Sequence, residues 1–311
     1  MAVERLAEQI SAMPGVQTIG HTFNDSPAQD MVNFSISVEV SDAIAGEQLA
    51  AITSRYLAEL ASGVFSGYHA ELTVRRGWNV FTVDSGNRMI ANTDQVVEQA
   101  RDWVALRHEF PLATVELNAT IVHPDGPLAV QEFGHSDVAR VSLADPSDFA
   151  RVADAVTVLS KNFARLAGME WTITAGRLHP AEISSRRRYP SAAELDVWAR
   201  LNVDQSIPHI DALRINWLTT SPVWFSEKTT RSHDVSAALA LATRHLPIVA
   251  ELSAPILYSA SDQLSGHIGG RGYARGPVAV TVGGCTPRDP LIYSPIPDEQ
   301  ALIDRYAKCR G

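Results

Sequence analysis

The stretch from residue 138 to residue 174, VARVSLADPSDFARVADAVTVLSKNFARLAGMEWTIT, shows most clearly how this chain folds. In its middle, apolar residues recur every three or four positions and so line one stripe of a helix: Phe149, Val152, Val156, Leu159, Phe163 and Leu166. Apolar and polar residues alternate before and after this helix, as they do in half-buried strands. The stretch therefore predicts a strand, an amphipathic helix and a second strand.

The same order of elements recurs on both sides of this stretch. Helical spacing predicts two comparable helices, over residues 44–60 and over residues 235–246, and Pro247 is expected to end the second. Alternation predicts strands beside these helices at residues 33–40, 71–75, 213–217, 223–225 and 248–252.

Another kind of amphipathic helix opens each unit of this pattern, near residues 3, 93 and 191. The sequence thus predicts an α+β protein of about three helix–strand–strand–helix–strand (αββαβ) units. Mostly antiparallel sheet with helices on one face is expected, as in split-βαβ or ferredoxin-like folds. The predicted units are residues 1–90, residues 91–189 and a divergent third unit, residues 190–311, with a glycine-rich loop and a C-terminal helix over residues 298–309.

The charge of the chain argues against nucleic-acid binding. Its 311 residues carry a formal net charge of −9, whereas binding to a phosphate backbone depends on clustered Lys and Arg. Lysine is nearly absent from this Arg-rich and Ala-rich chain, a composition typical of high-GC genomes such as those of actinobacteria. No apolar run approaches the roughly 20 residues that a membrane-spanning helix needs.

The two cysteines of the chain, Cys285 and Cys309, both lie near its C-terminus. They are either two buried thiols or a disulfide that ties the terminal helix back to the preceding strand. Closing that loop is expected to stabilise the fold by about 3 kcal/mol. A disulfide predicts an extracytoplasmic protein, in which Met1 follows a removed signal or membrane-anchor segment.

The most unusual local sequence is the glycine-dense loop from Gly266 to Gly276, which contains Arg271, Tyr273 and Arg275. Its backbone N–H groups and arginines are candidates for binding an anion or a partner. The loop lacks the Gly-Lys-Ser/Thr of a phosphate-binding loop and no helix pattern follows it, so a mobile hairpin loop is the alternative interpretation.

Two further groups of polar residues suggest function less specifically. Arg186, Arg187 and Arg188 form the one basic run, which suits either an acidic partner or a solvated turn. Residues between His123 and Asp137 include two histidines and two aspartates, but Pro124 and the residues after it are typical of a turn. No catalytic residue, metal site or cofactor is therefore predicted.

Tryptophans provide the strongest candidates for a binding surface. Trp103 and Trp198 fall on the opening helices and are expected to fill cores. Trp78 lies in a strand-like stretch, and Trp217, Trp224 and Phe225 lie on neighbouring predicted strands. If these side chains share an open sheet face, they form an amphipathic binding surface. The alternative is that another part of the chain covers that face.

These observations together predict a non-catalytic binding or assembly module of a bacterial cell envelope. The expected partner is a protein, or an envelope lipid or glycan, held on a sheet face or between units. Two alternatives remain open. One is a hydrolase that uses carboxylates or histidines near His123–Asp137, and the other is a self-assembling structural subunit.

Overall fold

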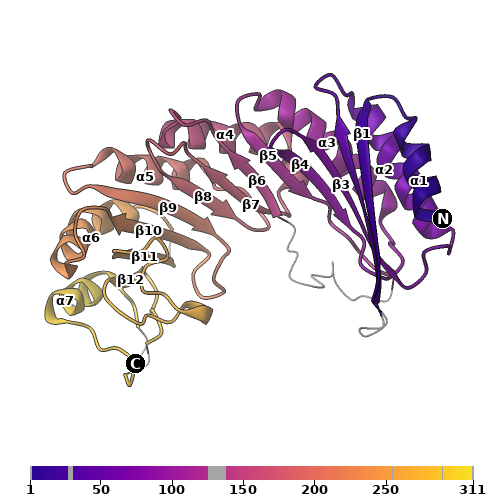
Figure 1. Ribbon diagram of the computed structural model, residues 1–311. Helices are drawn as coiled ribbons and strands as arrows, with labels where there is room; N and C mark the ends of the chain where they lie inside the picture. Colours follow the sequence, from indigo (N-terminus) through magenta and orange to yellow (C-terminus); the bar gives the residue numbers. More distant parts are fainter. Residues whose placement is uncertain (1, 27–30, 125–137, 254, 289, 310–311) are drawn as a thin grey trace. The chain divides into compact units, whose positions relative to one another are not determined.

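The computed structural model describes residues 2–26, 31–124, 138–253, 255–288 and 290–309. Within these ranges the chain forms seven α-helices and twelve strands (Figure 1). It divides into two compact units, Met1–Val141 and Ser142–Gly311. This division falls inside the predicted second unit, residues 91–189.

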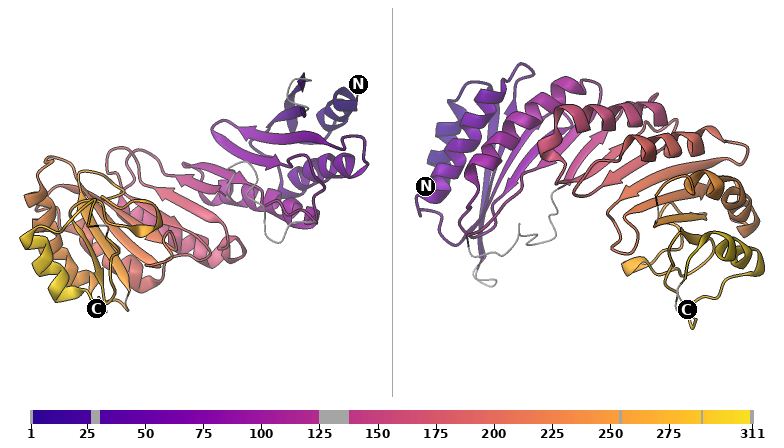
Figure 2. Two further views of the ribbon diagram at one scale, coloured as in Figure 1. Left: turned by 90° about the horizontal axis from the view of Figure 1, so that it is seen from below. Right: turned by 180° about the vertical axis from the view of Figure 1, so that it is seen from behind.

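The first unit pairs its strands in chain order. The β1–β2 and β3–β4 pairs are antiparallel hairpins, and the β2–β3 and β4–β5 pairs are parallel. The helices lie on one face of the strands (Figure 2). The elements are α1 (Ala2–Ser11), β1 (Val16–Ser26), β2 (Met31–Val40), α2 (Gly46–Ala61), β3 (Tyr68–Arg76), β4 (Asn79–Asp84), α3 (Thr93–Glu109), β5 (Thr114–Asn118) and β6 (Val138–Ser142), whose last residue crosses the unit boundary.

The second unit repeats this scheme. The β7–β8, β9–β10 and β11–β12 pairs are antiparallel, and the β8–β9 and β10–β11 pairs are parallel. Its elements are α4 (Phe149–Asn162), the 3₁₀ turn η2 (Ala164–Leu166), β7 (Glu170–Thr174), β8 (Glu182–Ser185), α5 (Ala192–Val203), β9 (His209–Ile215), β10 (Val223–Thr229), α6 (Val235–Val249), β11 (Ile256–Ser261), the 3₁₀ turn η3 (Gly270–Gly272), β12 (Ala279–Val282) and α7 (Pro297–Tyr306).

A mixed α/β fold is therefore present, but the ferredoxin-like units with mostly antiparallel sheet are not confirmed. Across the described residues the element order is a helix followed by two strands, six times, and then α7. Within each unit, the hairpins described above join antiparallel neighbours and the helices between them cross over to parallel neighbours, so the two kinds of pair alternate. The short strand β8 is not among the strands that alternation predicts, and without it the shorter repeat is concealed.

The predicted amphipathic helices are present, and the tryptophans on the opening helices are buried as predicted. Trp103, Trp171 and Trp198 are fully buried. Ser191 begins α5 with a capping box, because its hydroxyl accepts from the N–H of Glu194 while the Glu194 carboxylate accepts from the N–H of Ser191.

Two predictions at the end of α6 are wrong. Pro247 lies inside the helix, which continues to Val249, and the strand predicted at residues 248–252 is instead β11, which begins at Ile256. Leu246 and Val249 are both fully buried and continue the apolar stripe past the proline. Burial of this stripe outweighs the hydrogen bond that proline removes from the last turn.

The predicted disulfide joins Cys285 and Cys309, whose Cα atoms are 4.7 Å apart. Two backbone hydrogen bonds support the same closure, since Gly283 N–H donates to the Tyr306 carbonyl and Lys308 N–H to the Gly284 carbonyl. The bridge ties the segment after α7 to the end of β12. Among the described helices, none is long and apolar enough to cross a membrane.

Candidate functional site

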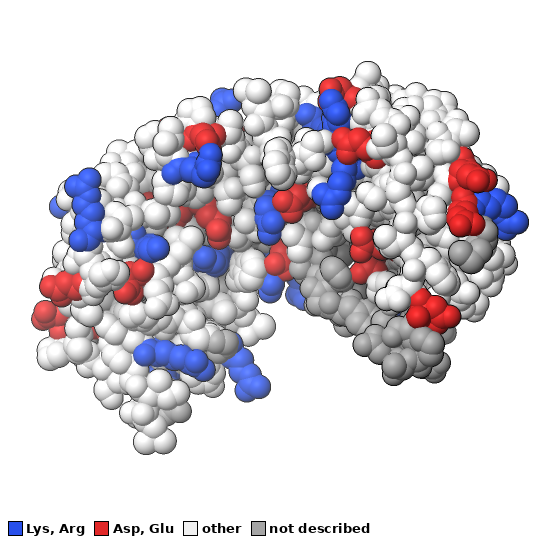
Figure 3. Space-filling view, in the orientation of Figure 1, with Lys and Arg blue, Asp and Glu red and all other residues white. Residues whose placement is uncertain are grey.

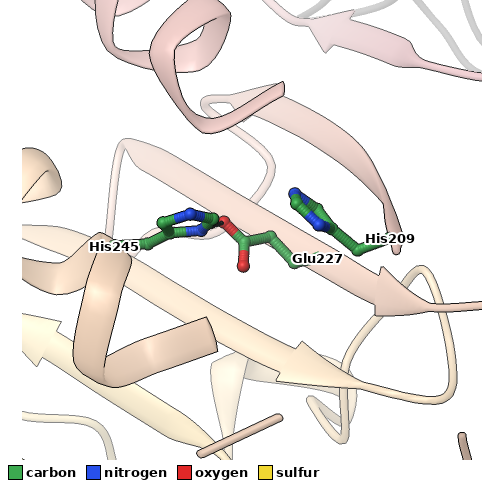
Figure 4. Close-up of side chains that lie close together, drawn as sticks. All are labelled: His209, Glu227 and His245. Carbon is green, nitrogen blue, oxygen red and sulfur yellow. Dashed lines mark hydrogen bonds and ion pairs between the residues drawn. The ribbon is translucent and has the colours of Figure 1, made fainter. Parts of the chain in front are cut away.

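A row of ionisable side chains lies on the face of β9 and β10 that α6 covers. Asp211 pairs directly with Glu227 across the two strands, and His209 pairs with Thr229 two positions further along. Because side chains alternate along a strand, His209, Asp211 and Glu227 project to the same face. His245 reaches them from α6, and Figure 4 shows its ring against the Glu227 carboxylate. All four side chains are buried.

His245 is held between two carboxylates. Its Nδ1 lies 2.6 Å from Oε1 of Glu227, and its Nε2 lies 3.3 Å from Oδ2 of Asp204 at the end of α5. The other oxygen of Glu227 accepts a hydrogen bond from the hydroxyl of Tyr258 on β11. Arg244 in turn places its Nη2 2.7 Å from Asp204. A continuous polar chain thus runs from Arg244 at the surface into the core.

His209 and Asp211 are much less well satisfied. Nδ1 of His209 lies 2.6 Å from the carbonyl oxygen of Ile207, and its Nε2 is 3.2 Å from Oδ2 of Asp211. The geometry of that second approach is too poor for a hydrogen bond. Within the described chain, Nε2 of His209 and both carboxylate oxygens of Asp211 therefore have no hydrogen-bond partner. Buried polar atoms without a partner are costly, so this site has unused binding capacity.

The carboxylates set the protonation of the two histidines. Burial disfavours the imidazolium form, but Asp211 and Glu227 outweigh it and raise the pKa of His209 to about 9. Burial likewise opposes charging of His245, whose pKa is raised above its usual value by Glu227. Burial raises the pKa of Asp211 to about 6. At neutral pH His209 is therefore charged, and Glu227 also favours the charged form of His245.

This arrangement can also hold a metal ion. One ligand atom from each of His209, Glu227 and His245 lies within 4.8 Å of the others. Two imidazoles and a carboxylate are a typical zinc ligand set. The histidines are separated by 36 positions and Glu227 lies between them, so no short spacing motif reveals them. The signal that the sequence does carry is the placement of polar residues at core positions of apolar strands.

The first unit contains a different kind of site, an open pocket of about 680 Å³ near the β3–β4 turn. Trp78 at that turn is 85% exposed, and Leu112 is 83% exposed. Both are among the residues that line the pocket, together with Asp42, Arg76, Arg107 and Phe110.

Arg107 is a largely buried cation of this pocket whose charge is poorly compensated. Its side chain is 8% exposed and stacks on Trp103, with the guanidinium carbon 4.8 Å from the ring centroid. Its Nε and Nη1 are buried without a hydrogen-bond partner, and its Nη2 is 3.9 Å from Asp42. Asp42 is itself engaged by both Arg76 nitrogens that face it. Burial lowers the pKa of Arg107, as expected for a cation with little compensation.

The structure does not bring the four predicted aromatic residues onto one surface. Trp78 belongs to the first unit and the others to the second. Phe225 is fully buried among core residues, while Trp224 points to the opposite face of β10 and is 6% exposed beneath Arg214. Trp217 is partly exposed and stacks with Arg186 at 3.7 Å. Adjacent strand positions face opposite ways, which separates Trp224 from Phe225.

The glycine-dense loop is a hydrogen-bonded hairpin. Gly269 N–H donates to the Tyr273 carbonyl, and Arg275 N–H donates to the His267 carbonyl. Arg271, Tyr273 and Arg275 are exposed, and Arg275 lines a pocket of about 450 Å³. At the start of this loop, the Leu264 carbonyl accepts hydrogen bonds from Arg214 and Ser226 of the sheet. The loop therefore packs on the strands and does not extend freely into solvent.

The remaining sequence candidates are accounted for locally. Arg186 pairs with Glu170 at 2.9 Å and Arg188 with Glu194 at 2.7 Å, so two residues of the basic run have partners within the chain. His123 is buried, and its Nδ1 lies 2.6 Å from the Met89 carbonyl oxygen. The rest of the proposed hydrolase segment, residues 125–137, lies outside the described residues.

Comparisons of the chain with protein-family models, with curated proteins and with solved structures found no match. Functional inference therefore rests on the two sites themselves.

Proposed function

We propose that the chain is an extracytoplasmic binding module and that the pocket beside Trp78 holds an acidic segment of a protein partner. The observation that carries this proposal is the Arg107 guanidinium, which lines the same pocket as exposed Trp78 and Leu112 and has two nitrogens without a hydrogen-bond partner. Trp and Arg are the residues that most often dominate binding energy at protein interfaces. Here they line one pocket.

The electrostatics of this pocket favour a carboxylate. Elsewhere, surface arginines already have acidic neighbours, such as Arg177 with Asp145 at 2.8 Å and Arg200 with Glu251 at 2.6 Å. Figure 3 shows the same interspersion of blue and red groups on the face in view. Arg107 differs because Asp42 is 3.9 Å away and is shared with Arg76. A carboxylate from a partner would balance the charge of the Arg107 guanidinium. Because this guanidinium is partly desolvated, the resulting ion pair would be stronger than one at the open surface.

The shape of the pocket favours an apolar group next to that carboxylate. Large exposed apolar side chains clustered in one place mark interaction surfaces. Trp78 and Leu112 form such a place, and both are free to pack on a partner side chain. The Cys285–Cys309 disulfide supports an extracytoplasmic location, because disulfides persist in oxidising compartments. A bacterial cell envelope is such a compartment.

Selection from a random peptide library with free C-termini on the immobilised full chain tests this proposal. We expect the selected peptides to carry a carboxylate beside an apolar residue and to change Trp78 fluorescence. Trp78→Ala and Arg107→Gln should each weaken binding about tenfold or more, as hot-spot substitutions do. Leu178→Ala is the matched control, since Leu178 is 69% exposed in the other unit.

The assignment of this pocket would be overturned if the selected peptides bound Trp78→Ala and Arg107→Gln as tightly as the wild-type chain. A library that yields no binder above background would overturn the peptide-binding function itself. Preferential capture of acidic polysaccharide over every peptide would replace the protein partner with a glycan.

A further inference from the structure

We propose that His209, Glu227 and His245 bind one divalent metal ion in the core of the second unit, with zinc as the best fit and Asp211 as the fourth ligand. This proposal is independent of the pocket near Trp78, which lies in the first unit.

The donor atoms are placed for a compact, low-coordinate ion. The three ligand atoms lie within 4.8 Å of one another, and all three side chains are buried. Tetrahedral ligands at zinc distances are separated by roughly 3.4 Å, so binding requires the closest pair of donors to move apart and the more distant donors to approach. Imidazole and carboxylate donors in a tetrahedral site suit zinc better than the oxygen-rich, higher-coordinate calcium.

Each prospective ligand is already oriented by a second group. His209 directs Nδ1 to the Ile207 carbonyl, which leaves its Nε2 facing the cluster. His245 directs Nε2 to Asp204, which leaves Nδ1 facing Glu227. Carbonyl and carboxylate partners of this kind fix the ring and tautomer of metal-binding histidines in known sites.

Glu227 is oriented in the same way. One of its oxygens accepts from Tyr258, so the other oxygen is directed at His245 Nδ1. Nδ1 and that oxygen are 2.6 Å apart, with a proton between them in the metal-free state. A bound ion would replace this proton and push the two donors apart, while leaving the Tyr258 and Asp204 contacts in place.

The buried carboxylates of Asp211 and Glu227 also favour the binding of a cation. With both histidines neutral, Asp211 and Glu227 leave two negative charges in the core, because the Arg244 guanidinium is half exposed and pairs with the partly exposed Asp204. One divalent ion would neutralise them and leave both imidazoles free to coordinate. It would also occupy the unpartnered oxygens of Asp211 and Nε2 of His209, which no described group satisfies. Protonation of both histidines balances the charge but leaves those atoms without partners.

Zinc content of the full chain is the direct test. The protein is unfolded with chelator, refolded with its disulfide intact in zinc or in EDTA, and analysed by elemental mass spectrometry. We expect about one zinc per chain and a melting temperature about 5–10 °C higher than in EDTA. Cobalt substitution should give the intense visible absorption of a tetrahedral site. Because both cysteines are in the disulfide, thiolates cannot produce these signals.

Substitutions identify the ligands. Glu227→Gln and His209→Gln should remove the zinc, whereas His233→Gln, at a side chain that is 92% exposed in the same unit, should retain it. If either core variant fails to fold, Asp211→Asn keeps all three principal donors and should weaken zinc binding by about tenfold or more.

Wild-type protein that refolds with excess zinc but contains none overturns the proposal and leaves a metal-free hydrogen-bonded network. Zinc that is lost equally from His233→Gln, or retained by both Glu227→Gln and His209→Gln, places the metal elsewhere and overturns the assignment. None of these results affects the peptide-binding test, which probes the other unit.

Discussion

Single residues in this protein depart from ordinary burial rules where polar groups lie inside apolar layers. Asp211 and Glu227 occupy core positions of β9 and β10, and the largely buried Arg107 lines a pocket with the exposed Trp78. Leaving a buried polar group unpaired costs about 1–3 kcal/mol, which is a large part of a typical domain's stability. Residues that destabilise the fold in this way are retained when they contribute to binding. Stability is then traded for function.

Arg107→Met tests that trade-off at the residue scale. Replacing a buried, poorly paired cation with an apolar side chain of similar length should leave the free energy of unfolding unchanged or raise it by about 1 kcal/mol. Peptide binding should be lost at the same time. Urea denaturation of the metal-free and peptide-free chain measures the first effect. A clear loss of stability would show that Arg107 serves the fold and not a ligand.

At the scale of elements, helix α6 shows how packing overrides local preference. Its buried stripe runs from Ala238 to Val249, and the exposed Pro247 lies in the last turn. The helix places His245 over β10, so its continuation through this turn also shapes the buried cluster. A sequence pattern correctly predicts that this helix exists, but its end depends on how much apolar surface the last turn buries.

Pro247→Ala should therefore stabilise the second unit. Alanine restores the backbone N–H that proline lacks and removes the ring's clash with the preceding turn, for a gain of about 1–2 kcal/mol. Ala240→Pro, at an exposed position near the middle of the same helix, is the matched control and should cost about 3 kcal/mol or more. Circular dichroism during chemical denaturation reports both. A loss of stability in Pro247→Ala would mean that the fold depends on proline in this turn.

On the scale of the whole molecule, the chain combines two compact units with different specialised features. The first contains the open pocket beside Trp78, and the second contains the buried histidine cluster and the disulfide. Both use the same alternation of hairpin and crossover helix, so the scaffold does not explain their differences. Those differences come from the side chains at a few positions.

The disulfide should stabilise only the unit that contains it. Replacing Cys285 and Cys309 together with serine reopens a loop closed over 24 positions and should cost about 3 kcal/mol. In scanning calorimetry the transition of the second unit should fall, while that of the first should stay in place. A gain of two hydrogens on reduction of the wild-type chain confirms the bridge by mass spectrometry. A uniform fall of both transitions would show that the units unfold as one.

Local information in the sequence determined several features of this protein on its own. Apolar spacing located the helices and placed Trp103 and Trp198 in cores, because these features depend on residues a few positions apart. A disulfide between the two cysteines was also one of the two interpretations that their positions in the sequence allowed. The alternation of parallel and antiparallel strands could not be predicted in this way, since strand β8 is short and its pairing depends on distant residues.

Only the tertiary structure brought together the residues of each candidate site. Strand register sets Glu227 opposite Asp211, and a slip of one residue would break that pairing and exchange the faces on which Trp224 and Phe225 lie. The packing of α6 brings His245 onto that pair from a separate part of the chain, and the fold of the first unit leaves Arg107 with one distant carboxylate. Sites built from long-range contacts leave no spacing motif, because the residues that meet are neighbours in space and not in sequence.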